Sequence, residues 1–424
     1  MKCSRITMPT NYSPNSRRAS NGYCRVEPGI GVGGLRARRH STRAYRLLSA
    51  FRERWRVVPI WFATAHWVFG GSAPERLSSR QVSDLRLGNP VQSVTGVAFY
   101  AGKLYAATTA ALVETADGSN LSHYLWSRTG SVVEGPWVDR ANGLLWVGLP
   151  DRGELARFDG KRWVEVSSPK PRRGYVTRGE ALTGLVGISD KTRFWMVGAG
   201  RAWNWNPARA GRWVEETELL LASAPRGLTR LRTLVPSDDV TYFVLHDDHE
   251  PSFLLQDVWR DMGWLDRLHG DAVYCRTRDG DVLTTNLAGK FFVVQAVRGN
   301  HSAYLRTSDG GVVQASNGSV ARVPAPAFCE ALATASGGDL VGSFRGKGIF
   351  RLAAGWHRVL EPPPHTPPGE RLVCLACEGN CIAVGIHPLP EPSGSAARFF
   401  PAEGLWYAND TGWKQIPLLE GRRQ

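Results

Sequence analysis

The chain has 424 residues, a hydrophobic fraction of 42% and a formal net charge of +14. This length and apolar content are typical of a folded globular protein and exclude a wholly disordered chain. The charge is unevenly distributed, because residues 1–56 contain twelve Arg and one Lys against Glu27 and Glu53 and so hold +11 of the total. Residues 57–424 carry only +3, and we therefore expect no nucleic-acid partner for the folded part.

The first 56 residues are rich in Arg, Ser, Asn and Gly and contain few aliphatic side chains before Leu47. Such a composition cannot bury enough apolar surface to offset the entropy of ordering, so it predicts a disordered basic tail. Two alternatives stay open. The segment is either a basic arm that binds anionic surfaces and carries the function of the protein, or an upstream extension that a later translation start would omit.

Residues 57–73 have the order of a secretory signal peptide. The charged stretch 52–56 precedes an apolar core of 13 residues, Val57–Phe69, and Gly70-Gly71-Ser72-Ala73 supplies a small-residue cleavage site. The core is shorter than the ~20 residues that a spanning helix needs, so we expect no transmembrane span. The order favours an exported protein, periplasmic or extracellular. The alternative is an apolar segment that packs on the domain of a cytoplasmic protein.

The stretch Gly143–Trp163 contains the clearest structural pattern in the sequence. Residues 144–149 (LLWVGL) form an apolar run of strand length between turn residues, which predicts a strand buried on both faces. A second short strand is expected at 155–158, followed by an Asp159-Gly160 turn and a third strand that begins at Trp163. Because one meander cannot bury both its faces, it requires neighbours of the same kind.

Related stretches recur along the chain from about residue 82 to residue 420. We count units at 94–126, 133–166, 180–216, 228–265, 271–297, 301–323, 328–360 and 371–417, of which 271–297 and 301–323 look short and could share one blade. The spacing of a little over 40 residues predicts a single all-β propeller of seven blades, with eight as the alternative and with almost no helix. We expect ring closure to pair strands from the two ends of the array, since an open sheet edge would favour aggregation.

Two of these units resemble a known repeat. GLLWVGLPDRGELARFDGKRW (143–163) and GDLVGSFRGKGIFRLAAGWHRV (338–359) are similar to the two-component regulator propeller repeat. The resemblance implies a β-propeller and a binding role, because propellers of that family are mostly exported sensor modules. It supplies no functional residue of this chain.

Two clusters could carry metal or sulfur chemistry. His246, Asp248 and His249 lie together in His246–Glu250, after a predicted strand, and such side chains suit a divalent metal. The alternative is a solvated turn, and we expect no metal cofactor. Cys377 and Cys381 flank a Glu-Gly-Asn turn, where a disulfide would suit an exported protein; buried thiols and, together with Cys374, a zinc site are the alternatives.

Arg172 and Arg173 lie in a basic loop between two units, where they either border a ligand site or are simply solvated. The sequence contains no phosphate-binding loop, G-x-S-x-G elbow or HExxH motif. We therefore expect a monomeric, non-enzymatic propeller that recognises a small molecule or a protein through loops on one face. A metal-dependent lactonase or lyase that uses the His246 cluster is the alternative.

Overall fold

The computed structural model describes the chain from residue 73 to residue 419, with gaps. The described residues are 73–85, 87, 93–169, 186–189, 192–198, 200–207, 211–221, 230–237, 240–246, 271–277, 282–285, 292–316, 319–335, 337–364, 366, 371–388, 404–410 and 412–419. They belong to one compact unit, Phe69–Gln424. The expected disordered tail and signal peptide lie outside the described residues, so both stay predictions.

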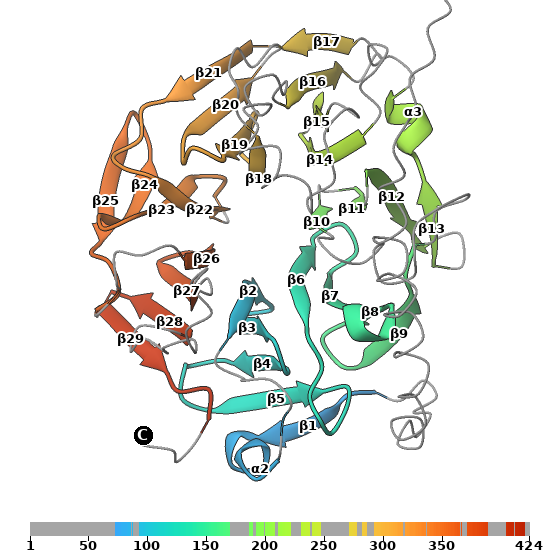
Figure 1. Ribbon diagram of the computed structural model, residues 1–424, viewed down its shortest axis with the longest axis vertical. Helices are drawn as coiled ribbons and strands as arrows, with labels where there is room; N and C mark the ends of the chain where they lie inside the picture. Colours follow the sequence, from blue (N-terminus) through green and yellow to red (C-terminus); the bar gives the residue numbers. More distant parts are fainter. Residues whose placement is uncertain are drawn as a thin grey trace, which may run out of the picture. The chain divides into compact units, whose positions relative to one another are not determined.

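Seven antiparallel sheets make up this unit, and each is built from consecutive strands of the chain (Figure 1). The first sheet contains β1 (Glu75–Ser78), β2 (Val94–Tyr100), β3 (Lys103–Thr108), β4 (Leu112–Thr115) and β5 (Leu121–Leu125). The second contains β6 (Glu134–Asp139), β7 (Leu144–Leu149), β8 (Glu154–Phe158) and β9 (Trp163–Ser167). The third contains β10 (Val186–Ser189), β11 (Phe194–Gly198), β12 (Arg201–Asn206) and β13 (Arg212–Glu215).

The remaining four sheets have four strands each. The fourth contains β14 (Arg230–Pro236), β15 (Val240–His246), β16 (Ala272–Thr277) and β17 (Val282–Thr285). The fifth contains β18 (Val293–Arg298), β19 (Ala303–Thr307), β20 (Val312–Ser316) and β21 (Ser319–Val323). The sixth contains β22 (Cys329–Thr334), β23 (Leu340–Phe344), β24 (Gly348–Leu352) and β25 (Trp356–Leu360). The seventh contains β26 (Arg371–Glu378), β27 (Cys381–Pro388), β28 (Gly404–Asn409) and β29 (Gly412–Ile416).

The seven sheets close into a ring. The innermost strands β2, β6, β10, β14, β18, β22 and β26 each contact the innermost strands of both neighbouring sheets, and β26 contacts β2. Figure 1 shows these strands around the centre and β5, β9, β13, β17, β21, β25 and β29 toward the outside, with β1 beyond β5. The fold is therefore a seven-bladed β-propeller, which confirms the predicted fold class and selects seven blades over eight.

The predicted central pattern is confirmed strand by strand. Residues 144–149 form β7, and every one of its residues is buried, as a strand covered on both faces requires. β8 and β9 follow, and the register pairs Phe158 with Trp163 across the turn. Gly160 in that turn has a φ of +91°, a conformation that side-chain-bearing residues rarely adopt.

The structure corrects the boundaries of one predicted blade. The unit expected at 271–297 divides between two blades, since β16 and β17 complete the fourth blade and β18 begins the fifth. The paired strands β15 and β16 are separated by an unusually long stretch of sequence. Residues 247–270 of this stretch lie outside the described part. The first blade also begins earlier than residue 82, because β1 pairs with β5 as a fifth, outermost strand.

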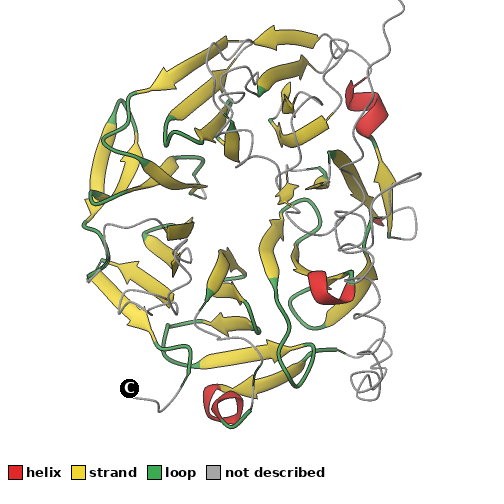
Figure 2. Cartoon of the chain, in the orientation of Figure 1, coloured by secondary structure: helices red, strands yellow, loops and turns green. Residues whose placement is uncertain are grey.

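Helix is confined to short segments, as predicted. The described residues contain α2 (Ser79–Ser83), α3 (Thr217–Leu221) and the 3-10 turn η1 (Pro150–Arg152), coloured red in Figure 2. Among the described residues, no helix is long and apolar enough to cross a membrane.

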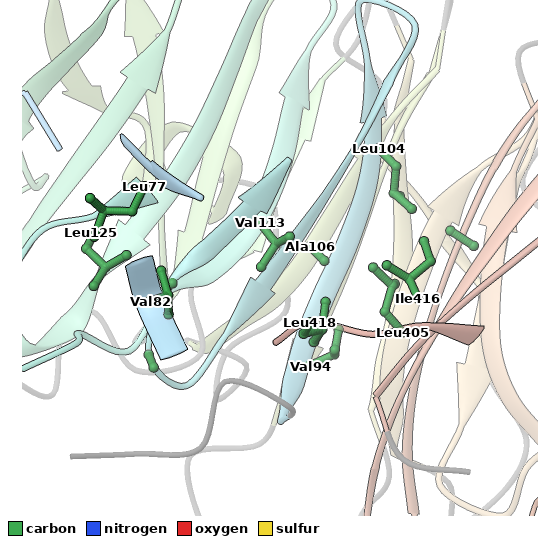
Figure 3. Close-up of a cluster of buried hydrophobic side chains, with 13 residues drawn as sticks. Leu77, Val82, Val94, Leu104, Ala106, Val113, Leu125, Leu405, Ile416 and Leu418 are labelled. Atoms are coloured by element: carbon green, nitrogen blue, oxygen red, sulfur yellow. The ribbon is translucent and has the colours of Figure 1, made fainter. Parts of the chain in front are cut away.

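The expected exchange of strands between the two ends of the array is wrong for the described strands. The first sheet contains only β1–β5 and the seventh only β26–β29. Side-chain packing joins them instead, since Val94 and Leu104 of the first blade share a buried cluster with Leu405 and Ile416 of the seventh (Figure 3). Beyond β29, the carbonyl oxygen of Leu418 accepts a 2.8 Å hydrogen bond from Nε2 of a buried histidine on β5. Each blade is therefore complete without a strand from the opposite end of the chain.

Candidate functional site

A polar pocket of about 360 Å³ opens at one end of the third blade. This end carries the connections from β6 to β7, from β10 to β11 and from β12 to β13. The volume falls within the range of small-molecule sites. Its lining residues are Asn142, Thr192, Arg193, Asn204, Trp205, Asn206, Pro207, Val214 and Glu216. We call it the third-blade pocket.

The second blade contributes one amide to the pocket, and a buried carboxylate holds that amide in place. Asp139, which is fully buried, accepts hydrogen bonds from the backbone N–H of Asn142 at 3.0 Å and from its Nδ2 at 2.8 Å. The indole Nε1 of Trp146 lies 3.3 Å from the same carboxylate. Burial raises the pKa of Asp139, although the hydrogen bonds from Asn142 and Trp146 oppose this effect.

A hydroxyl group fixes the turn of the second blade against the third blade. Oγ of Ser189, the last residue of β10, accepts hydrogen bonds from the backbone N–H groups of Arg140 and Ala141 at 2.9 and 3.3 Å. Because Asn142 follows directly, its position relative to the third blade is set by these two bonds. The two blades therefore form one rigid rim of the pocket.

The third blade contributes a charged pair and a buried amide. A guanidinium nitrogen of Arg193 lies 3.8 Å from Oε2 of Glu216, and Nδ2 of Asn204 donates to Oε1 of the same carboxylate at 3.4 Å. Both contacts are long for their kinds. The Arg193 guanidinium also lies 5.9 Å from the ring centroid of Trp195, a cation–π distance.

One polar atom of Asn204 has no partner among the described residues. The residue is only 9% exposed, and its Oδ1 is buried and accepts no hydrogen bond from any described residue. The amide orientation follows from Glu216, because turning the amide would bring oxygen against the carboxylate. A buried acceptor without a donor costs free energy, so the pocket favours a molecule that donates an N–H or O–H to Oδ1.

None of the described residues that line this pocket was singled out from the sequence. Arg172, Arg173, Asp248 and His249 lie outside the described residues, and His246 is the last residue of β15, with its side chain among the parts not described. Among the described residues, no three His, Cys, Asp or Glu side chains gather closely enough to hold a metal ion. Both predicted sites stay predictions.

The cysteines of the seventh blade are described as thiols. Cys374, Cys377 and Cys381 are all free. The register pairs Cys377 with Ile382 and Glu378 with Cys381, so the two cysteines point to opposite faces of the hairpin. The structure therefore gives no support to the predicted Cys377–Cys381 disulfide. Burial raises the pKa of the Cys377 thiol to about 12, which keeps it protonated at neutral pH.

Sequence comparison and structure comparison give different results. No family model and no curated protein matches the sequence. The extracellular domain of a proposed one-component system from B. thetaiotaomicron is 10% identical, with a TM-score of 0.47, and the match covers 76% of this chain and 39% of that one. PorZ, a surface component of the type-IX secretion system of Porphyromonas gingivalis, is 11% identical, with a TM-score of 0.45 and coverages of 76% and 40%.

A third solved structure, the WD40 β-propeller domain of Doa1, is 13% identical, with a TM-score of 0.45, and the match covers 75% of this chain and 94% of that domain. The chain thus spans about two fifths of the first two structures and nearly all of the third. At such low identity these likenesses concern the fold alone. The predicted membership of the two-component regulator propeller repeat family stays a prediction.

Proposed function

We propose that this protein is a non-enzymatic binding propeller that holds a small polar molecule in the third-blade pocket. The observation that carries the proposal is made at Asn204, which lines the pocket and whose buried Oδ1 has no hydrogen-bond donor among the described residues. A bound molecule with an N–H or O–H group would supply that donor.

The charges of the pocket narrow the class of molecule. The Glu216 carboxylate favours a cationic or hydroxyl donor, whereas the Arg193 guanidinium favours an anionic or carbonyl group. The two charges lie 3.8 Å apart, so a compact ligand with both kinds of group can satisfy them together. Amino acids and sugars with an acidic group meet this requirement.

A panel of free amino acids, neutral sugars and sugar acids tests the proposal by thermal unfolding and then by isothermal titration calorimetry. We expect at least one member to bind the wild-type protein. Arg193→Ala and Asn204→Leu should each weaken that binding about tenfold or more, equivalent to about 1.4 kcal/mol. Retention of wild-type affinity in both variants, or no binding by any member, would contradict the proposal.

A matched control is available on the sixth blade. Arg358 resembles Arg193 in exposure, with side chains 51% and 54% exposed, and it also pairs with a carboxylate, that of Glu361. It does not line the third-blade pocket. Arg358→Ala should therefore leave the affinity unchanged, which separates loss of a pocket contact from a general effect of removing a surface arginine.

A further inference from the structure

The guanidinium group of Arg306 has no hydrogen-bond or ion-pair partner among the described residues. The residue lies on β19, where it pairs with Val312 of β20, and its side chain is only partly exposed. Its Nε is buried and makes no hydrogen bond. Among the described residues, none forms a hydrogen bond or an ion pair with any of its guanidinium nitrogens.

The strand partner of Arg306 packs in an apolar cluster. Val312, its partner in the register, belongs to a buried cluster with Cys329, Leu332 and Phe344 of the sixth blade. The side chain therefore approaches the boundary between the fifth and sixth blades. Burial lowers the pKa of Arg306, against the opposing influence of Cys329 and Glu330.

Neither titratable neighbour supplies a full counter-charge. Burial raises the pKa of Cys329 to about 12, so its thiol is uncharged at neutral pH. The Glu330 side chain is only 2% exposed, and its carboxylate accepts a hydrogen bond at 3.2 Å from Nε of Arg345. The guanidinium groups of Arg306 and Arg345 thus have one carboxylate, that of Glu330, between them. One positive charge is left without a counter-charge.

The burial of Arg306 is one-sided. Its Nη atoms are not among the buried polar atoms without a partner, and no described residue hydrogen-bonds to them, so they retain contact with solvent. A molecule from solution can therefore reach the outer edge of the guanidinium. That edge presents parallel N–H donors, which match the two oxygens of a carboxylate or a phosphate.

We propose that Arg306 is the centre of an oxyanion-binding site at the boundary between the fifth and sixth blades, and that the site takes a small carboxylate or phosphate. A partly buried guanidinium with no counter-ion is costly, and a bound oxyanion both neutralises it and satisfies its donors. The site lies on a different blade from the third-blade pocket and does not depend on it.

Thermal unfolding of the full chain tests this site with inorganic phosphate and with acetate as probes, at constant ionic strength made up with sodium chloride. We expect the midpoint of the wild-type protein to rise saturably, by about 2 °C or more, with at least one of them. General salt effects on protein stability do not saturate, and they act on any variant. A response to phosphate alone would assign a tetrahedral anion, and one to acetate alone a planar carboxylate.

Three variants decide the outcome. Arg306→Met keeps the volume of the side chain but removes the charge, and should abolish the saturable rise. Arg306→Lys keeps the positive charge but lacks the planar guanidinium, and should weaken binding about tenfold. This variant also tests the proposal if Arg306→Met does not fold. Arg322→Met changes an exposed arginine of the same blade that pairs with Asp309 at 2.7 Å, and should respond as the wild type does. The proposal would be overturned if the midpoint of the wild-type protein showed no saturable rise. It would also be overturned if Arg306→Met and Arg306→Lys both showed the same saturable rise as the wild type.

Discussion

Glu114 on β4 is the buried carboxylate on which the polar side chains of the first blade converge. Oε2 accepts hydrogen bonds from the hydroxyls of Tyr124 and Tyr105 at 2.5 and 3.3 Å, while Oε1 contacts Lys103 at 2.7 Å and Arg76 at 3.4 Å. Burial alone would raise the pKa of Glu114, but the hydrogen bonds from Lys103 and Tyr124 and the two positive charges lower it overall. We expect Glu114→Gln to lower the free energy of unfolding by about 1–3 kcal/mol, because the buried hydroxyls lose a charged acceptor.

Urea unfolding at pH 7 measures this effect, and Glu361→Gln is the control. Glu361 is well exposed and pairs with the exposed Arg358, an arrangement that contributes little to stability. A Glu114 variant no less stable than the control would show that the tyrosine and lysine contacts are not a stabilising network.

At the same scale, the sequence predicts structural residues better than it predicts site residues. Trp163 could be placed at the start of a strand, because it recurs at a fixed distance from a glycine turn. Asn204 and Glu216 belong to no motif, and their importance depends on a pocket that forms only when three connections of two blades meet. In the sequence, such a site residue is marked only as a polar residue at an inward-facing strand position. Many strands contain a polar residue of this kind, so the pattern does not indicate which of them line a pocket.

The added outer strand β1 is an element that the repeat pattern does not include. Leu77 on β1 is 9% exposed and packs in the same buried cluster as Val82 of α2 and Leu125 of β5. We expect Leu77→Ala to destabilise the protein by about 2–3 kcal/mol, since truncation of a buried leucine removes apolar contacts and leaves a cavity.

Val359→Ala is the matched control for this prediction, because Val359 lies on the outer strand of the sixth blade and its side chain is substantially exposed. Its effect should stay within about 0.5 kcal/mol. Equal urea midpoints for the two variants would mean that β1 does not contribute to the stability of the first blade.

Strand prediction succeeds where the connections are short and fails where they are long. β7 was predicted to the residue, because turn signals bound it on both sides and its apolar run is continuous. The fourth blade was divided wrongly, since 25 residues or so of intervening chain separate β15 from β16 and spacing then ceases to indicate which strands pair. β1 was missed for a related reason: it precedes the first repeat and has only four residues.

At the scale of the whole molecule, the sequence predicts a propeller of seven or eight blades, but it predicts neither the choice between these numbers nor the manner of closure. A spacing of about 40 residues reflects four short strands and their turns, and this fixes the architecture. Closure depends on whether the terminal strands find partners within their own blade. Here β2–β5 and β26–β29 already form complete sheets. Among the described residues, the ends are joined by apolar packing and by side-chain hydrogen bonds, one of which is the buried contact of His123 with the Leu418 carbonyl oxygen.

The burial of the histidine in that hydrogen bond makes the stability of the fold dependent on pH. His123 on β5 is 0% exposed and donates from Nε2 to the Leu418 carbonyl oxygen at 2.8 Å. Burial lowers its pKa below the ordinary value of about 6.5, against the smaller opposing effect of the hydrogen bond to Leu418. The folded protein therefore keeps the ring neutral, while the unfolded chain takes up a proton as the pH falls below about 6.5. The free energy of unfolding should then decrease with falling pH, by up to about 1.4 kcal/mol per pH unit from this group, and be independent of its titration above pH 7.5 or so.

Urea unfolding of the wild-type protein and of His123→Gln between pH 8 and pH 5 tests this dependence. The variant should be less stable at pH 8, because it loses the buried imidazole and its contact with Leu418, but its stability should decrease less steeply below pH 6.5. His301→Gln, which removes an exposed histidine, should retain the wild-type slope. If wild type and His123→Gln lose stability in parallel on acidification, the titration of His123 does not contribute to the acid sensitivity of the fold.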